Sequence, residues 1–242
     1  MKKPLASAPH LAPSLRAVPF LKGAADRDAV VLTNRQREQL ARISLRLRLP
    51  ARMVIYREEA AADWVFAVAE GVVKCYRDLP SGKRVVGAFL FAQDLFGLAE
   101  NGRYLNCAQA ITGVTLYRFP LSDLIVLMKH DADLQFQFLA KVTHELRESQ
   151  RRTILINRRD AAGRLAMFVV ALMHRHPARS AGSGLVPLPM TRSDIADFLG
   201  LSLESVSRAA AELERRGLVR FENRHLARIV DAARLSKLVA AV

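Results

Sequence analysis

Cysteine and long apolar runs are both scarce in this chain of 242 residues. The two cysteines, Cys75 and Cys107, lack the short spacing of metal ligands and fit a reducing compartment. No run approaches the roughly 18 apolar residues that a membrane-spanning helix needs. Prolines interrupt the basic N-terminus before an apolar signal segment can form. We therefore expect a cytoplasmic protein with a flexible tail over residues 1–28 and no contact with a membrane.

Histidine is absent between Met53 and Phe119, the part of the chain richest in strand-forming residues. A small β-barrel of the cupin kind hosts metal chemistry through histidines and carboxylates on its strands, so this absence argues against such an enzyme. The hydrolase pattern G-x-S-x-G and the phosphate loop G-x-x-x-x-G-K-[ST] are missing as well. The sequence predicts no enzyme, no catalytic residue and no metal site.

Acidic residues are outnumbered, and the formal net charge is +14. The first 57 residues hold 12 Lys and Arg against 3 Asp and Glu, whereas residues 58–140 hold 7 against 10. The remaining residues, 141–242, are basic again, with 18 against 10. A polyanionic partner is therefore expected. The net charge by itself would fit either nucleic acid or an anionic membrane surface, and the acidic middle is not expected to bind DNA.

The apolar pattern changes period twice along the chain. A helix capped by Thr33 is expected over residues 33–48. Short β-rich runs separated by turn signals then indicate a barrel or sandwich of about 90 residues. Helical spacing returns from Asp131. The runs expected as strands are Met53–Tyr56, Trp64–Ala69, Val72–Arg77, Arg84–Phe91 and Ala108–Phe119.

The stretch Thr191–Gly217 predicts two short helices joined by a tight turn. Thr191 and Asp194 form a T-x-x-D capping box, Gly200 supplies the positive φ of a sharp exit, and Ser202 caps the second helix. The buried stripe of that helix is expected to be Leu203, Val206, Ala210 and Leu213. A small residue at 196, glycine at 200 and valine at 206 meet the packing needs of a DNA-binding helix-turn-helix, against the alternative of an ordinary helical hairpin.

The residues around this motif complete the C-terminal part. A helix over Ala161–His174 is followed by a glycine- and serine-rich loop over residues 176–184 and a short strand over Leu185–Leu188. After the second helix of the motif, Leu218–Phe221 and Leu226–Ile229 flank a turn at Asn223, which predicts a two-stranded wing. Asp231 is expected to cap a last helix.

A helix over Asp131–Asn157 would be about 40 Å long at 1.5 Å per residue, more than a small domain requires. This length suits a two-stranded coiled coil and hence a homodimer. The alternative is a helix of a monomer, packed against the barrel. The seam of the predicted dimer is Phe138, Val142, Leu146, Ser149, Thr153 and Ile156.

This order of parts resembles the CRP/FNR superfamily of transcription regulators. VFAVAEGVVKCYRDLPSGKRVVGAFLFAQDLFGL is similar to the sensor barrel of that family, and MTRSDIADFLGLSLESVSRAAAELERRGLV is similar to its FNR/FixK branch. The resemblance implies an α+β fold with four parts: a flexible tail (residues 1–28), a cyclic-nucleotide-binding-like β-roll or jelly-roll sensor domain (29–130), a dimerisation helix (131–160) and a winged helix-turn-helix domain (161–242). It also implies a dimeric activator that contacts RNA polymerase and binds double-stranded DNA at a TTGA-type inverted repeat.

The FNR/FixK branch carries Glu-x-x-Ser-Arg on its reading helix, here Glu204, Ser207 and Arg208. Their chemistry fits that role independently, because arginine can donate a bidentate pair to guanine and glutamate can accept from cytosine. The alternative is an exposed i, i+4 ion pair between Glu204 and Arg208. Residues at the N-termini of the two helices are expected to meet phosphate, namely Thr191, Arg192, Ser193, Ser202 and Ser205.

The sensor departs from the family pattern for cyclic nucleotides. The glutamate that such proteins place after the Phe-Gly turn is here Leu98, and their Arg-Ser pair is here Tyr104 and Leu105. Arg103 is a weak substitute for the cation that a cyclic phosphate needs. FNR itself holds an iron–sulfur cluster with cysteines near its N-terminus, where this chain has none. Neither cyclic AMP nor such a cluster is therefore expected.

Two alternatives remain for the sensor: it has no effector at all, or it binds an apolar or aromatic small molecule. No cofactor is expected, and the alternative is haem, whose axial ligands could come from the two cysteines or from His10, His130, His144, His174 and His176. Each cysteine could also be a redox-sensitive thiol, although a buried inert thiol is the simpler interpretation. By resemblance, the walls of an effector pocket would be Phe96, Leu98, Leu105, Gln109, Phe138 and Val142.

Overall fold

The computed structural model describes residues 13, 15, 32–157, 160–175 and 184–240. Most of the predicted tail and residues 176–183 of the predicted loop therefore lie outside the described residues; of the tail, Pro13 and Leu15 are described, and both are buried. The chain forms two compact units. The first comprises residues up to Arg77 together with Gly87–Glu148, and the second comprises Asp78–Val86 together with Ser149–Val242.

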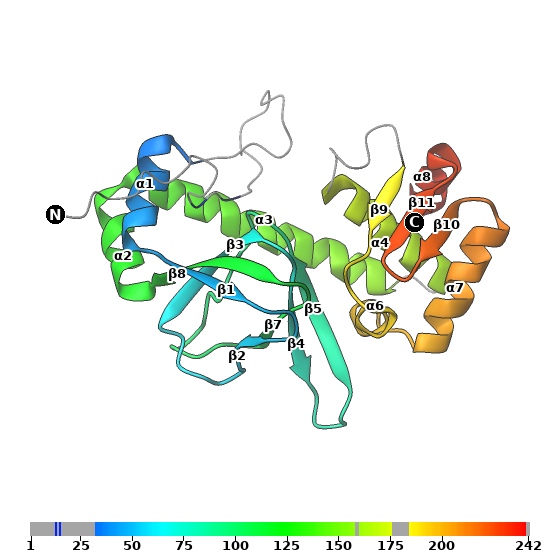
Figure 1. The fold of residues 1–242 in the computed structure, drawn as a ribbon, viewed down its shortest axis with the longest axis horizontal. Coiled ribbons are helices and arrows are strands. Elements are labelled where there is room, and N and C mark those ends of the chain that lie inside the picture. The colour runs from blue at the N-terminus through cyan, green and yellow to red at the C-terminus, as the bar shows by residue number, and fades with distance from the viewer. Residues whose placement is uncertain (1–12, 14, 16–31, 158–159, 176–183, 241–242) are drawn as a thin grey trace. The chain divides into compact units, whose positions relative to one another are not determined.

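Two four-stranded sheets form a barrel (Figure 1). Most of it belongs to the first unit, and the segment Asp78–Val86, with the end of β4 and the start of β5, belongs to the second. One sheet has the order β1-β8-β3-β6 and the other β2-β7-β4-β5, and β8 pairs antiparallel with both β1 and β3. The strands are β1 (Leu45–Leu49), β2 (Val54–Tyr56), β3 (Trp64–Glu70), β4 (Val73–Asp78), β5 (Arg84–Leu90), β6 (Leu95–Phe96), β7 (Cys107–Ala110) and β8 (Val114–Pro120). The helices that begin in this unit are α1 (Asn34–Ile43), α2 (Leu121–His130) and α3 (Ala132–Asn157).

The structure corrects the prediction at the N-terminal edge of the barrel. The predicted helix over residues 33–48 ends at Ile43, and Leu45–Leu49 is strand β1. The sequence LRLRL alternates with period two, which places Leu47 and Leu49 against the barrel core and exposes Arg46 and Arg48. The single strand expected over Ala108–Phe119 is two strands, β7 and β8, and Leu121–His130, for which no helix is predicted, forms α2.

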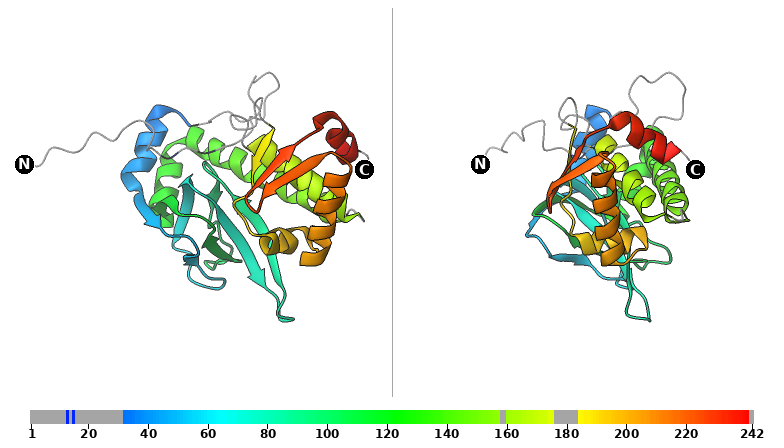
Figure 2. Two further views of the ribbon diagram at one scale, coloured as in Figure 1. Left: turned by 45° about the vertical axis from the view of Figure 1, so that its right-hand side comes forward. Right: turned by 90° about the vertical axis from the view of Figure 1, so that its right-hand side faces the viewer.

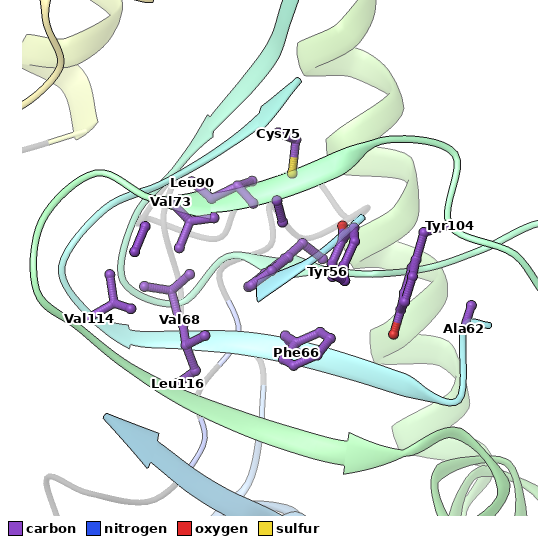
Figure 3. Close-up of a cluster of buried hydrophobic side chains, with 13 residues drawn as sticks. Tyr56, Ala62, Phe66, Val68, Val73, Cys75, Leu90, Tyr104, Val114 and Leu116 are labelled. Carbon is purple, nitrogen blue, oxygen red and sulfur yellow. The ribbon is translucent and has the colours of Figure 1, made fainter. Parts of the chain in front are cut away.

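The apolar side chains of β3 face two separate cores. Phe66 and Val68 point into the barrel, where they join the cluster drawn in Figure 3. Val65 and Ala67 point to the opposite face of the sheet and pack with residues of α1, α2 and α3. Because both faces of β3 are covered, its sequence is a nearly continuous hydrophobic run rather than an alternating one.

The second unit contains the winged helix-turn-helix that the sequence predicts. Strands β9 (Leu185–Pro187), β10 (Val219–Asn223) and β11 (Leu226–Ile229) form an antiparallel sheet of order β10-β11-β9. Asp231 accepts a hydrogen bond from the backbone N–H of Arg234 at 2.9 Å, which confirms it as a cap of the last helix. The helices of this unit are α4 (Ala161–Arg175), α6 (Arg192–Leu199), α7 (Leu203–Arg215) and α8 (Ala232–Ala240), seen in two further views in Figure 2.

Candidate DNA-binding interface

Local hydrogen bonds fix both helix starts of the motif. The N–H of Asp194 donates to Thr191 Oγ1 at 3.1 Å, and the N–H of Thr191 donates to Asp194 Oδ2 at 3.0 Å, which confirms the predicted capping box. Gly200 has a φ of 66°, the left-handed conformation expected at this exit. Ser202 Oγ then accepts from the N–H of Ser205 at 3.1 Å and starts α7.

Small and apolar side chains hold the two helices together. Ala196 and Val206 are buried between them, and Ala210 and Leu213 continue the buried stripe of α7. The prediction is wrong for Leu203, which is 49% exposed. Since Leu203 opens the helix directly after the turn, the packed stripe begins one turn later, at Val206.

The opposite face of α7 presents polar side chains to solvent. Glu204 and Arg208 are exposed, and Ser207 is half-buried beside them. Arg208 Nη2 donates to Ser205 Oγ at 3.2 Å, and Arg192 Nη1 reaches Ser207 Oγ at 3.4 Å. These contacts are few and solvent-exposed, so the donors of Arg208 stay available to an external acceptor.

The carboxylate of Glu204 is held in its charged form. Its pKa is lowered by a hydrogen bond from its own backbone N–H, by the Ser202 hydroxyl and by the charge of Arg208. An ionised carboxylate is an acceptor only, whereas a guanidinium is a donor only. Successive turns of one exposed helix face therefore offer opposite hydrogen-bonding character, which is the chemistry that distinguishes base pairs in a major groove.

The predicted phosphate contacts lie where the two helices begin. Thr191, Arg192 and Ser193 are exposed at the start of α6. Ser202 is exposed and Ser205 half-buried at the start of α7. Free backbone N–H groups and the helix dipole favour an anion at both places. These positions remain predictions for DNA contact.

The wing carries a basic residue, Arg224, that was not among the predicted DNA contacts. Asn223 Oδ1 accepts from the N–H of His225 at 2.7 Å and shapes the turn between β10 and β11. Arg224, inside that turn, is exposed. The sequence could have pointed to Arg224, because it is a basic residue in the predicted wing turn and follows an asparagine that favours such turns.

The six residues expected around an effector pocket are not brought together. Phe96 belongs to the cluster inside the barrel, whereas Phe138 belongs to the cluster beneath the helices. The Nε2 of Gln109 donates to the carbonyl of Arg52 at 2.9 Å. The other three side chains are exposed: Leu98, Leu105 and Val142.

Aromatic rings occupy the interior of the barrel instead. The rings of Tyr56 and Tyr104 stack with their centroids 3.8 Å apart, and those of Phe66 and Phe96 lie 5.2 Å apart. Figure 3 shows Tyr104 and Tyr56 side by side at one end of the cluster. The hydroxyl of Tyr104, which replaces the arginine of cyclic-nucleotide binders, donates to the carbonyl of Trp64 at 2.8 Å. A buried phenol engaged in this way offers no charge to a cyclic phosphate.

The two cysteines have different surroundings. Cys75 is buried in the barrel, and burial raises the pKa of its thiol to about 12. Cys107 is half-buried, and its Sγ accepts from the N–H of Glu58 at 3.3 Å. Of the histidines considered for haem, His10 and His176 lie outside the described residues. No three His, Cys, Asp or Glu side chains gather into a metal-binding group within the part of the chain that the structure describes.

The long helix α3 carries an exposed apolar stripe, but its first member is not the predicted one. Phe138 is buried in the cluster beneath the helices, whereas Leu139 is 56% exposed. One residue turns the side chain by about 100° around an α-helix, which separates the face on the barrel from the face in solvent. Val142 and Leu146 continue the exposed stripe as expected. Ser149 and Thr153 are exposed and Ile156 is half-buried.

Taken together, the fold and the polar face of α7 define a regulator that joins a sensor-type barrel to a winged helix-turn-helix. Comparisons with protein families agree with this class. A model described as the cyclic nucleotide-binding domain matches residues 46–131, and one described as the Crp-like helix-turn-helix domain matches residues 163–238. Within the described residues, no helix is long and apolar enough to cross a membrane.

Individual relatives narrow the assignment. The chain is 32% identical over 204 residues to the transcriptional activatory protein AadR of Rhodopseudomonas palustris, covering 84% of this chain and 85% of the relative. It is 32% identical to the nitrogen fixation regulation protein FixK of Bradyrhizobium diazoefficiens, with 86% of each covered. The solved structure of FixK2 from Bradyrhizobium japonicum matches with a TM-score of 0.75 and 31% identity, covering 83% of this chain and 99% of that one. The chain belongs to the CRP/FNR superfamily of transcription regulators, in its FixK-like branch, and is not an enzyme.

Proposed function

We propose that this protein is a homodimeric transcription activator that binds a TTGA-type inverted repeat in the cytoplasm and needs neither cyclic AMP nor an iron–sulfur cluster. The observation that carries the proposal is the exposed face of α7, where an ionised carboxylate and a guanidinium lie on successive turns. Two relatives, the transcriptional activatory protein AadR and the nitrogen fixation regulation protein FixK, support a role in activating transcription.

Base recognition would divide among three side chains. Arg208 would donate to guanine O6 and N7, and Glu204 would accept from the amino group of cytosine. Ser207 would reach a neighbouring base edge or a phosphate. The helix N-termini of α6 and α7, with Arg192 beside them, would hold the phosphate backbone and set the depth of α7 in the groove.

Dimerisation through α3 is supported by its exposed apolar side chains. Leu139, Val142 and Leu146 fall at spacings of three and four residues, the pattern of a coiled-coil seam. Phe136 and Ile154, also exposed, would flank this seam. A two-fold dimer would present two α7 helices about 34 Å apart, as an inverted repeat with half-sites one helical turn apart requires. RNA polymerase is the further partner that an activator of this family would contact.

Independence from an effector is supported by the packed interior of the barrel. The rings of Tyr56, Phe66, Phe96 and Tyr104 lie together in the barrel core, with neighbouring centroids 3.8 to 6.1 Å apart. The rival proposal, a sensor for haem or a small aromatic ligand, would require these rings to move apart. The rival proposal predicts that the protein without additives does not bind the inverted repeat selectively.

Fluorescence anisotropy of the purified, ligand-free protein tests the proposal. The probe is a duplex with a TTGA-type inverted repeat, and the control is a scrambled duplex of equal length, both at physiological salt. Selective binding without additives supports an effector-independent dimer, and the affinity should fall steeply as salt is raised. Binding that does not distinguish the duplexes contradicts it, and selectivity that returns only with added haem or an aromatic compound favours the rival.

A further inference from the structure

The C-terminal end of α6 has carbonyl groups that the helix cannot satisfy. An α-helix leaves its last carbonyls without backbone partners, and the helix dipole makes that end negative. The carbonyl of Ala196 receives the N–H groups of Gly200 and Leu201. The carbonyls of Phe198 and Leu199 instead receive arginine side chains from outside the motif.

Two different helices supply these arginines. Arg164 of α4 donates through Nη1 to the carbonyl of Leu199 at 3.0 Å. Arg152, near the end of α3, reaches the carbonyl of Phe198 through Nη2 at 3.4 Å, and its guanidinium lies 5.0 Å from the centre of the Phe198 ring. The position of α6 is thus tied to both helices that precede it in the chain.

Arg152 has a second anchor outside the helices. The same Nη2 donates to the carbonyl of Val86 at 2.6 Å. Val86 is fully buried, and it belongs to the segment Asp78–Val86 of the β4–β5 hairpin, which is part of the same compact unit as α6 and α7. We call the contacts of Arg152 with Val86 and Phe198 the Arg152 bridge.

The hairpin is braced at the position of this anchor. Arg84 Nε and Nη2 donate to the two carboxylate oxygens of Asp78 at 2.7 and 2.9 Å, linking the strands in a bidentate pair. The carbonyl of Val86 therefore lies on a two-stranded support rather than on a single extended segment. The guanidinium of Arg152 is partly desolvated, which lowers its pKa, and the carbonyls and the Phe198 ring compensate part of that cost.

We propose that Arg152 is a positioning residue for DNA recognition: through the Arg152 bridge, the β4–β5 hairpin and α3 together set the orientation of α6 and, with it, of the reading helix α7. This inference rests on the proposed function. It assigns Arg152 no contact with DNA. Arg152 would instead influence how the two α7 helices of a dimer are oriented toward the two half-sites.

The substitution Arg152→Met tests this, because methionine keeps an unbranched apolar stem and removes every donor. The matched control is Arg147→Met, which removes the same charge from an exposed position of the same helix. Each full-length protein is titrated with inverted repeats that differ only in spacer length, with a single half-site and with a scrambled duplex. The same proteins are compared by thermal unfolding and by hydrogen exchange.

Arg152→Met is expected to bind the preferred repeat about tenfold more weakly, the effect of losing hydrogen bonds from a charged group. It should also prefer one spacer less sharply than the wild type, with half-site binding unchanged. Exchange should quicken in the hairpin and in α6. Arg152→Lys keeps the charge but reaches fewer carbonyls. Its affinity and its spacer preference should therefore lie between those of the wild type and those of Arg152→Met. Loss of stability alone would not change the spacer preference, so this readout separates positioning from folding.

Equal spacer profiles for Arg152→Met and Arg147→Met would overturn the inference. If Arg152→Met does not fold, Arg152→Lys decides, and a wild-type spacer profile together with wild-type exchange in the hairpin would overturn it. Failure of the proposed function is recognised separately, because the wild-type protein would then not distinguish the repeat from the scrambled duplex.

Discussion

The barrel and the helix-turn-helix use charged side chains in opposite ways. In the barrel unit, Lys141 is fully buried, and its Nζ lies 3.2 Å from Asp94 and 2.6 Å from Glu145. In the second unit, Arg208 is exposed, and it donates a hydrogen bond to the hydroxyl of Ser205. The first cation is enclosed by protein acceptors, whereas the second faces solvent. The proposal that Arg208 contacts DNA rests on this exposure, whereas the contacts of Lys141 are all within the protein.

Lys141→Ala should have the largest effect. The substitution leaves Asp94 buried without the lysine, and removing one partner of a buried ion pair typically costs about 3–5 kcal/mol. Urea denaturation should show a loss of that order in the free energy of unfolding. The control Lys129→Ala, at an exposed position of α2, should stay within about 0.5 kcal/mol of the wild type. If Lys141→Ala lost no more stability than Lys129→Ala, the core would not depend on this ion pair.

Arg208→Ala should leave the fold intact and weaken specific DNA binding by about 1–3 kcal/mol, the worth of a bidentate contact with a base. Anisotropy titrations with the inverted repeat and with the scrambled duplex measure this, with Arg234→Ala on α8 as the control for loss of one exposed positive charge. Equal losses on both duplexes would show that Arg208 meets phosphate rather than a base.

Two capping boxes sharpen the comparison, one in each unit. Thr33 with Gln36 starts α1, and Thr191 with Asp194 starts α6. Thr33→Ala and Thr191→Ala should each cost about 1 kcal/mol of stability in thermal unfolding, the usual worth of an N-cap. Only Thr191→Ala should also weaken DNA binding, because its hydroxyl lies at a predicted phosphate contact. A similar loss of DNA affinity for Thr33→Ala would remove the distinction between the units.

The cysteines should show the smallest effect near neutral pH. Burial raises the pKa of Cys75 to about 12, whereas an unfolded cysteine ionises near about 8.5. The stabilising effect of the buried neutral thiol is therefore complete below the unfolded pKa and is lost as the pH rises towards 12. At pH 8, a thiol reagent should label Cys107 in the folded protein and Cys75 only in urea. Rapid labelling of Cys75 without denaturant would show that the barrel opens.

The sequence predicts the helix-turn-helix closely because its signals are local. Thr191, Gly200 and Ser202 each act within a few residues, so their caps and turn need no knowledge of the rest of the chain. The strand Leu45–Leu49 was not predicted, because it follows a helix that starts at Thr33 and the helical pattern was extended through it. Its pairing with β8, a segment far along the chain, is what makes it a strand. On α3, Phe138 and Leu139 are both apolar, and the sequence does not say which of them faces the barrel. In the Arg152 bridge, Arg152 contacts Val86, which is 66 positions away in the sequence, and Phe198, which is 46 positions away. No local sequence pattern predicts contacts over such separations.

The division of the chain has a consequence for any attempt to separate its parts. The segment Asp78–Val86 belongs to the second unit although residues on both sides of it belong to the first. The polypeptide therefore crosses between the units three times, after Arg77, after Val86 and after Glu148. A fragment that begins at Ser149 would contain both helices of the motif but would lack the carbonyl of Val86 that Arg152 requires. A single cut in the chain therefore cannot release the second unit whole, although its helix-turn-helix motif is continuous in sequence. A gene fusion that keeps only the residues after 148 would leave out Asp78–Val86, the other segment of that unit.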